Sequence, residues 1–480
     1  MSVPGRQVIA ARGSLALSCI YLLHRRPMRP PSLFGRVSCC FTLLVPLVLQ
    51  ADLLAAAAEV QGSHGAVASW CDRVNAAQPG DEVVLQPGVY AEPCVVRAVG
   101  TVDKPITVRS VDAGTPVDEQ PLASRAQLMY AGSDANIVEL RSPAKHLVFK
   151  GLWWSSGSGN GADALRFIDV ADITVDNCLF EKLNSQAITA NSDANTTNIA
   201  IQNSVFRDMP FTVIYLGCHD GSCRCTNYTL RNNLITASSP GFVVGGKDGT
   251  GYCVEAKVNS QGTVVGNTFY HSKGPNLAVY GAADGASKPT LVERNWFSGS
   301  KNDGALWIGG GPVIARHNVA SSGANVGIGT QDYGGRGLQR NITIVFNTVL
   351  NSKIGVQLDS AWTDVTQGNT VAYNLVAGTG ASEAVSPSRP AKLLKGNRLC
   401  KSWSDCFAGS GLAPWNLAPS SSVATVSCPT DEAWWSPVDL FGTARACHDG
   451  TKPGAVITAD MPVSGFPGRF ANGTFGLPAR

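Results

Sequence analysis

Three successive apolar segments of the chain carry a lysine, a tyrosine and a tryptophan at neighbouring outward positions. The segments are Val254-Glu-Ala-Lys257, Leu277-Ala-Val-Tyr280 and Leu306-Trp-Ile-Gly309. Side chains alternate between the two faces of a strand, so Glu255 and Lys257 share the outward face. If the segments stack as neighbouring strands about 4.8 Å apart, Lys257, Tyr280 and Trp307 gather on one outer surface. A cation, a phenol and an indole on one surface could bind and process an extended polar ligand.

Further polar residues are expected in loops that leave the same edge of these strands. They are His219 with Asp220, Lys247 with Asp248, and the group Asp332, Tyr333 and Arg336. A histidine exchanges protons near neutral pH. A lysine does so only where its surroundings favour the neutral amine, a condition that Lys247 or partial burial could meet. The pattern predicts a catalytic role for Lys257, Tyr280 and His219. It predicts a substrate-binding role for Lys247, Glu255, Trp307, Asp332, Tyr333 and Arg336.

A structural role is the alternative for each of these residues. An outward lysine such as Lys257 often only protects a sheet edge. His219 could order its cysteine-rich loop, and Tyr280 could belong to an aromatic stack. Asp332 and Arg336 could fix a glycine-rich loop. The sequence leaves these alternatives open.

The elements that would position these residues follow from a repeat along the middle of the chain. Short apolar frames centre on Asn177, Asn203, Asn232, Asn267, Asn295, His317, Asn347 and Asn374, with spacings of 26, 29, 35, 28, 22, 30 and 27 residues. A period of this length indicates a solenoid, and strand-turn frames make it a β-helix. Asparagine tolerates the left-handed conformation that a sharp corner demands. We therefore expect an asparagine ladder at the corners, with His317 taking one of its places structurally.

Composition and charge agree with many strands joined by tight turns. The 480 residues include 51 glycines and 27 prolines, and only 15% are charged. Six of the 38 basic residues but one of the 35 acidic residues lie in 1–58, so the rest carries a net charge of −2. No basic tract suggests nucleic acid as a partner.

The first 58 residues resemble a secretory leader. Arginines precede an apolar run from Phe41 to Leu49, and small residues suited to cleavage follow at 55–58. Met28 is a candidate for the true start, and a membrane anchor is the alternative. The sequence thus predicts a secreted protein, extracellular or periplasmic, with no membrane association after cleavage.

Cysteine usage agrees with export. Three of the 14 cysteines lie in the leader, and the other eleven predict five disulfides with Cys178 buried and unpaired. Their connectivity stays open. Zinc binding is disfavoured because the spacings do not resemble a zinc module.

The segment Ala76-Ala-Gln-Pro-Gly-Asp81, with Gly100–Ser110 after it, resembles the opening of right-handed parallel β-helix proteins of the pectate-lyase type. The resemblance implies an all-β, right-handed parallel β-helix with an N-terminal helical cap. The expected organisation is a leader over 1–58, a cap and first coil over 59–110, the β-helix over 111–380, and an irregular, disulfide-bearing C-terminal cap and tail over 381–480.

The context of Lys257 resembles that of the catalytic lysine in alginate lyases of the chondroitinase-B kind, where a strand ending in lysine precedes an Asn-Thr-Phe corner. Here that corner is Asn267-Thr-Phe269. Tyr280 stands where that family carries an arginine. The His219-Asp220 pair also resembles part of a motif of bacterial mannuronate epimerases, with Cys218 in place of a proline. Calcium is common in such lyases, although no carboxylate cluster here resembles a dedicated calcium loop.

These observations predict a secreted polysaccharide lyase that cleaves an acidic, uronic-acid-containing polymer by β-elimination. A polyuronate C5-epimerase shares the first proton abstraction, and a non-catalytic carbohydrate-binding or surface protein is the third reading. A glycoside hydrolase would need paired acids, which Glu255, Asp248 and Asp332 do not form. We expect a monomer, with Ca²⁺ as the candidate cofactor and no metal-ligating residue assigned.

Overall fold

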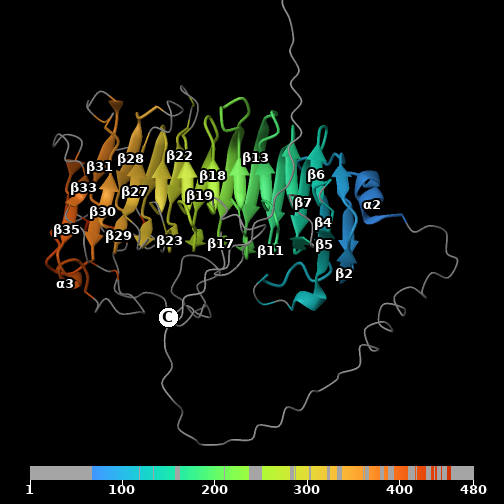
Figure 1. Ribbon diagram of the computed structural model, residues 1–480, viewed down its shortest axis with the longest axis horizontal. Coiled ribbons are helices and arrows are strands. Elements are labelled where there is room, and N and C mark those ends of the chain that lie inside the picture. Colours follow the sequence, from blue (N-terminus) through green and yellow to red (C-terminus); the bar gives the residue numbers. More distant parts are fainter. Residues whose placement is uncertain are drawn as a thin grey trace, which may run out of the picture. The chain divides into compact units, whose positions relative to one another are not determined.

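The computed structural model describes the chain from residue 68 to residue 455. The gaps in this range are 118, 120, 133, 157–162, 210, 237–250, 282–285, 287, 302–303, 322–324, 332–337, 361, 363–366, 379–382, 387–393, 409–416, 418, 429–433, 437, 440–444 and 446–450. The described chain winds into a solenoid of three parallel sheets, which confirms the predicted all-β parallel β-helix (Figure 1). The expected leader lies outside the described residues. No helix of the described residues is long and apolar enough to cross a membrane.

Each sheet takes one strand from every coil, and neighbouring strands are parallel. Sheet A contains β1 (Glu82–Leu85), β4 (Ile106–Ser110), β7 (Lys145–Lys150), β10 (Ala171–Asp176), β13 (Thr196–Gln202), β16 (Cys225–Arg231), β19 (Gln261–Val265), β22 (Thr290–Glu293), β25 (Val313–Arg316), β28 (Ile342–Val345), β31 (Thr370–Ala372) and β34 (Leu394–Lys395). Sheet B contains β2 (Gly88–Tyr90), β5 (Ala126–Tyr130), β8 (Trp153–Ser156), β11 (Leu179–Glu181), β14 (Val205–Arg207), β17 (Leu234–Thr236), β20 (Thr268–Tyr270), β23 (Trp296–Ser298), β26 (Val319–Ser321), β29 (Thr348–Leu350), β32 (Leu375–Ala377) and β35 (Arg398–Cys400). Sheet C contains β3 (Cys94–Val96), β6 (Val138–Arg141), β9 (Leu165–Ile168), β12 (Ile188–Ala190), β15 (Ile214–Leu216), β18 (Val254–Ala256), β21 (Leu277–Val279), β24 (Leu306–Ile308), β27 (Val326–Thr330), β30 (Ile354–Gln357) and β33 (Glu383–Ser386).

Inward side chains of the three sheets form one continuous core. Val254 and Ala256 of β18 point into it, as strand alternation requires. Aromatic rings stack from coil to coil, with Phe180 and Phe206 at a centroid distance of 4.7 Å. Like residues on successive coils therefore meet, because each coil repeats the path of the one before.

Two consecutive residues form the corner between sheets A and B, and they have different structural roles. The expected ladder assigned both roles to one asparagine, and the structure corrects this. The first residue has positive φ, and the second lies buried beneath the next sheet-B strand. At Gly266-Asn267 the glycine has φ 66°, while the Asn267 amide donates to Asn295 Oδ1 at 3.0 Å. The left-handed residue is thus not the asparagine itself at this corner.

The amide ladder runs through Asn233, Asn267, Asn295, Asn318, Asn347, Asn374 and Asn397. Two expected members, Asn232 and His317, are instead the left-handed residues before it, with φ of 53° and 55°. Asn177 and Asn203 also take the left-handed place, with φ of 56° and 52°. The assignment of His317 to the ladder is wrong, because Asn318 fills that place.

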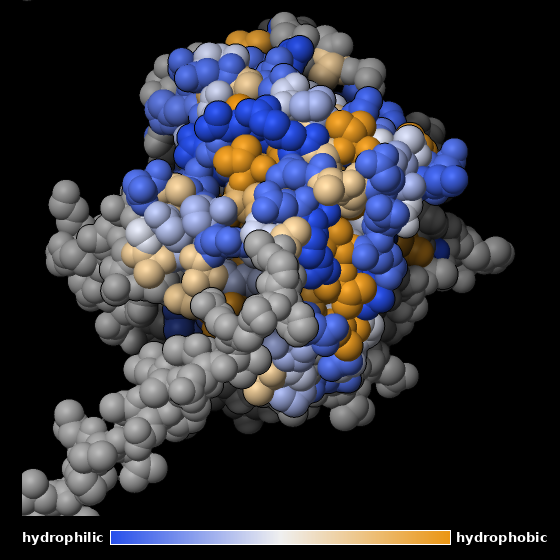
Figure 2. Space-filling model, turned by 90° about the vertical axis from the view of Figure 1, so that its right-hand side faces the viewer, coloured by the Kyte–Doolittle hydropathy of each residue, from blue (hydrophilic) through white to orange (hydrophobic). Residues whose placement is uncertain are grey.

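The N-terminal end of the solenoid is covered in part by helix α2 (Trp70–Ala76). Trp70 and Val74 of α2 enter the core, and the disulfide Cys71–Cys94 ties the helix to β3. Figure 2 views this end of the molecule, where apolar and polar residues both reach the surface. Val89 of β2 and Val95 of β3 are among the exposed apolar residues.

Strand pairing passes the expected boundary at residue 380 and continues to Cys400. Helix α3 (Trp403–Cys406) follows, and a second disulfide joins Cys400 to Cys406. Later residues return to the solenoid wall, where Trp434 and Trp435 contact Phe346. Arg445 covers the same ring at 4.7 Å and lies 3.1 Å from His317 Nδ1.

The prediction of five disulfides is wrong. Cys178 is free and buried as expected, but Cys225 and Cys253 are also free and buried. Cys225 takes an inward position on β16, and Cys253 lies directly before β18. The core surrounds both side chains. Cys428 is disulfide-bonded, and Cys447 lies outside the described residues.

Candidate active site on the outer face of sheet C

The outward residues of sheet C form a column in which each pairs with the same position on the next coil. Tyr215 pairs with Glu255, Glu255 with Ala278, and Ala278 with Trp307. Lys257 and Tyr280 each lie directly after β18 and β21, two residues beyond this column. The structure thus brings Lys257, Tyr280 and Trp307 to one side of the solenoid, as the sequence predicts.

The Lys257 ammonium lies between two tyrosine rings. Its Nζ is 4.9 Å from the centroid of Tyr215 on the preceding coil and 4.9 Å from that of Tyr280 on the following coil. It also donates to Glu255 Oε1 at 2.6 Å, and Thr212 Oγ1 donates to the other oxygen at 3.4 Å. Ring faces and a carboxylate all attract a cation. These partners hold the Lys257 side chain in one position.

Burial is the main difference from the sequence-based expectation. We expected an exposed sheet, whereas only 4% of Lys257, 6% of Glu255 and 7% of Tyr280 and Trp307 are exposed. Tyr215 is half-buried and is the most exposed of the aromatic residues around the ammonium. A ligand that approaches this side therefore meets Tyr215 before it meets Lys257.

The C-terminal side of Lys257 is apolar. Tyr280 and Trp307 pack in one cluster with Val258, Ala278 and Val326. The Trp307 ring lies over Gly329, where a Cβ would come within 2.1 Å of it. Trp307 Nε1 is buried and makes no hydrogen bond within the described part of the chain.

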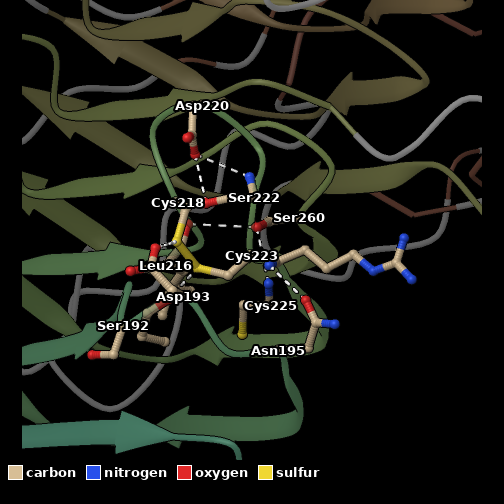
Figure 3. Close-up of a disulfide and its surroundings, with 12 residues drawn as sticks. Ser192, Asp193, Asn195, Leu216, Cys218, Asp220, Ser222, Cys223, Cys225 and Ser260 are labelled. Carbon is tan, nitrogen blue, oxygen red and sulfur yellow. Dashed lines mark hydrogen bonds between the residues drawn. A yellow bond between two sulfur atoms is a disulfide. The ribbon is translucent and has the colours of Figure 1, made fainter.

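A short disulfide-closed loop lies beside Lys257. Figure 3 shows its disulfide together with Asp220, Ser222 and Ser260. Cys218 and Cys223 close the loop, and it begins at Gly217, whose φ is 82°. A Cβ on Gly217 would come within 2.3 Å of Ser260 Oγ and 3.5 Å of Lys257 Cβ, so glycine is needed for this close approach. The loop is therefore packed directly against the turn that follows Lys257.

His219 is exposed in this loop. The neighbouring Asp220 accepts hydrogen bonds from Ser222 N at 3.0 Å and Ser222 Oγ at 2.7 Å, and these bonds, helped by His219, lower the pKa of Asp220. Asp220 thus orders the loop itself.

Lys247, Asp332, Tyr333 and Arg336 lie outside the described residues, so their predicted roles stay predictions. Tyr215 and Thr212 are the residues that sequence reasoning missed. The sequence does carry an apolar segment, Val213-Ile-Tyr-Leu-Gly217, whose Tyr215 falls opposite Glu255 once Ile214 is set against Val254. Among the residues that the structure describes, no three His, Cys, Asp or Glu side chains form a metal site.

No protein-family model matches the chain, and no curated protein matches it. Solved structures do match. The complex structure of XylC with xylose has a TM-score of 0.54 at 10% identity, covering 81% of this chain and 95% of that one. The alginate lyase from Paenibacillus sp. str. FPU-7 has a TM-score of 0.42 at 13% identity, covering 69% and 96%.

The A-module of the mannuronan C-5 epimerase AlgE4 from Azotobacter vinelandii has a TM-score of 0.44 at 11% identity, covering 67% of this chain and 87% of that one. Polysaccharide lyases, an epimerase and surface adhesins are thus all among the matched structures. At such identities the likeness shows the parallel β-helix fold alone, and this scaffold carries many functions. Function has to be argued from the site.

Proposed function

We propose that the protein is a secreted, monomeric polysaccharide lyase that cleaves an acidic, uronic-acid-containing polymer by β-elimination beside Lys257. The observation that carries this proposal is the lysine ammonium held between Tyr215 and Tyr280 on the outer face of the solenoid. A polymer lying across the strands would meet the same outward column on every coil. The disulfides support secretion, since such bonds persist in oxidising compartments.

The first step of β-elimination removes the proton on the carbon next to the uronate carboxylate. Negative charge then develops on that carboxylate and needs a fixed cation nearby. Glu255 at 2.6 Å and two ring faces hold Lys257 in place, and its Nζ donates a hydrogen bond to the Glu255 carboxylate. We therefore assign charge stabilisation to Lys257, instead of the base role that the sequence suggests.

Proton transfer then falls to residues that a ligand can reach. We assign proton abstraction to His219, which is exposed in the adjoining loop. Of the two phenols, Tyr215 is half-buried and Tyr280 is 7% exposed. We therefore assign protonation of the leaving glycosidic oxygen to Tyr215 and the positioning of Lys257 to Tyr280. The carbon–oxygen bond to the leaving sugar breaks as the carbon–carbon double bond forms.

A hydrolase is a weaker explanation of the same geometry. Glycoside hydrolases place two carboxyl groups roughly 5–9.5 Å apart across the substrate. The neighbours of Glu255 along its column are Tyr215 and Ala278, and its own carboxylate is occupied by Lys257. No second carboxylate adjoins Glu255 in the column that the structure describes.

The test is a screen of polyuronates with ultraviolet detection of the unsaturated uronate that elimination creates. We expect turnover on at least one acidic polymer, and its loss in Lys257→Ala. Lys301→Ala is the matched control, because Lys301 is an exposed lysine two coils away. Tyr215→Phe should lower kcat strongly, whereas Tyr280→Phe should lower it less.

Three outcomes would contradict the proposal. Exchange of the C5 proton with deuterated solvent, without chain cleavage, would identify an epimerase. Binding of the polymer without cleavage or exchange would identify a carbohydrate-binding protein. Unchanged turnover in Lys257→Ala would remove this site from the reaction.

A further inference from the structure

Two arginines lie on sheet C toward the N-terminal end from Lys257. We infer that Arg141 of β6 and Arg166 of β9, together the arginine strip, bind carboxylates of the same polymer away from the point of cleavage. This inference rests on the proposed function, because it extends the binding surface of that site. The arginine strip would make the protein prefer polymers that carry acidic sugars.

The strip belongs to the same outward face as the candidate site. Arg166 pairs with Thr189, Thr189 with Tyr215, and Tyr215 with Glu255. Neighbouring strands are about 4.8 Å apart, so Arg166 lies roughly 10 Å from Tyr215 along the sheet. One extended chain crossing the strands can therefore reach from Arg166 to Tyr215, the half-buried ring beside Lys257.

On this face the arginine side chains are more exposed than the carboxylates with which they pair. The Arg166 side chain is 31% exposed while its partner Asp163 is 7% exposed, and the Arg141 side chain is 47% exposed while its partner Glu139 is 14% exposed. The carboxylates lie beneath, and the guanidinium groups face solvent. A ligand approaching this surface therefore meets cations, although each arginine has an acidic partner.

The Arg166 guanidinium is already held in one orientation. Its Nε donates to Ser192 Oγ at 2.8 Å and its Nη1 to Asp163 Oδ2 at 3.2 Å. Asp163 is itself fixed by hydroxyl donors from Ser185 at 2.7 Å and Thr189 at 2.9 Å. Arg166 Nη2 makes no hydrogen bond within the described structure. A fixed guanidinium with open donors suits a carboxylate, since little freedom is lost on binding.

The strip ends at a polar cavity of about 330 Å³. Asn136, Glu139 and Arg141 line it together with Asp134 and Val95. Asn136 Nδ2 donates to Glu139 Oε2 at 2.9 Å, and Glu139 accepts from Arg141. Ligand pockets begin at about this volume.

The opposite side of Lys257 differs in chemistry. There the outward column continues with Ala278, Trp307 and Gly329, which carry no charge. The described face therefore carries arginine–carboxylate pairs on its N-terminal side, with the guanidinium groups more exposed than the carboxylates, and is apolar on its C-terminal side. This asymmetry predicts that acidic sugars lie over β6 and β9, while uncharged ring faces lie over β24 and β27.

The test is calorimetric binding of oligouronates of two lengths, a disaccharide and a hexasaccharide, to wild-type protein and Arg166→Gln. We expect Arg166→Gln to lower the hexasaccharide affinity by about tenfold and to leave the disaccharide affinity unchanged. A carboxyl-reduced hexasaccharide should bind both proteins equally. The matched control is Arg207→Gln, because Arg207 is a 46% exposed arginine paired with buried Glu181 on sheet B.

Equal hexasaccharide affinity in wild type and Arg166→Gln would overturn the strip, and so would an equal loss in Arg207→Gln. Binding is measured with both proteins carrying His219→Ala, which removes the assigned base and prevents turnover, and cleavage is measured with His219 in place. The two proposals can therefore fail separately. Loss of affinity in Arg166→Gln without any cleavage would keep the strip and refute the lyase. Cleavage with unchanged affinity in Arg166→Gln would keep the lyase and refute the strip.

Discussion

Lys257 Nζ lies 2.6 Å from Glu255 Oε1, and both side chains are almost fully buried on the outer face of sheet C. The two residues lie two positions apart on one strand face, which places their charged groups side by side. Removing one partner from a buried ion pair leaves an uncompensated charge, which typically costs about 3–5 kcal/mol. The pair is thus a candidate for function, and breaking it should also destabilise the protein.

A mutant cycle on this pair is the first prediction. Glu255→Gln should destabilise the protein, because it leaves the ammonium without its carboxylate. Glu255→Gln combined with Lys257→Met should be less destabilised than Glu255→Gln alone. The melting temperatures of wild type, Glu255→Gln, Lys257→Met and the double variant would measure the interaction between the two residues. Additive losses in the double variant would mean that the two residues do not interact.

The second prediction separates two adjacent asparagines. Asn233 Nδ2 donates to Ile201 O and to Asn267 Oδ1, both at 2.9 Å, in a fully buried place. Asn233→Ala should cost roughly 2 kcal/mol or more, since buried polar groups lose their partners. Asn232→Gly should be nearly neutral, because φ of 53° suits glycine. Denaturant unfolding of both variants measures the difference, and equal losses would argue against the ladder assignment.

The third prediction concerns pH and His317. Burial first, and then Arg445, Arg316 and Arg294, hold the pKa of His317 well below its ordinary value. The unfolded chain therefore binds a proton at about pH 6.5 that the folded protein does not bind. Stability contributed by neutral His317 is present above that pH and is lost as the pH falls below it.

His317→Asn keeps a residue suited to positive φ and removes this titration. The fall in melting temperature between about pH 7.5 and about pH 5 should be smaller in the variant than in wild type. Thermal melts across that range would test it. An identical fall in both proteins would mean that other groups control the acid response.

The fourth prediction concerns the free thiols. Burial raises the pKa of Cys225 to about 12 and that of Cys178 to about 11, so neither is a thiolate near neutral pH. Peptides containing Cys178, Cys225 and Cys253 should react with an alkylating reagent only after unfolding. Peptide mass spectrometry without reduction would show this. Failure of Cys225 or Cys253 to react after unfolding would point to a disulfide instead.

The sequence was sufficient for the solenoid and for the outward face that Lys257, Tyr280 and Trp307 share. Both follow from strand alternation and a repeat, which are local patterns. It was insufficient for the corners, because asparagine suits the left-handed residue and the buried amide equally well. At Asn232-Asn233 and His317-Asn318 the backbone φ and the hydrogen bonds of the folded protein separate the two positions.

Burial of the candidate site could not be predicted from one strand at a time. The Tyr215 ring reaches Lys257 from the preceding coil and the Tyr280 ring from the following one. The predicted number of disulfides was wrong for a related reason. Cys225 and Cys253 face the interior of their own coils, and an inward cysteine packs as a small apolar residue.

The amide ladder keeps one register although its members are 23 to 34 residues apart in the chain. Extra residues in a long coil must therefore bulge outward between two ladder positions, leaving the stacked amides undisturbed. A solenoid built this way can lengthen or replace the segments around Lys257 one coil at a time. Such an architecture permits new substrate preferences to evolve through insertions, while the amide ladder and its register stay unchanged.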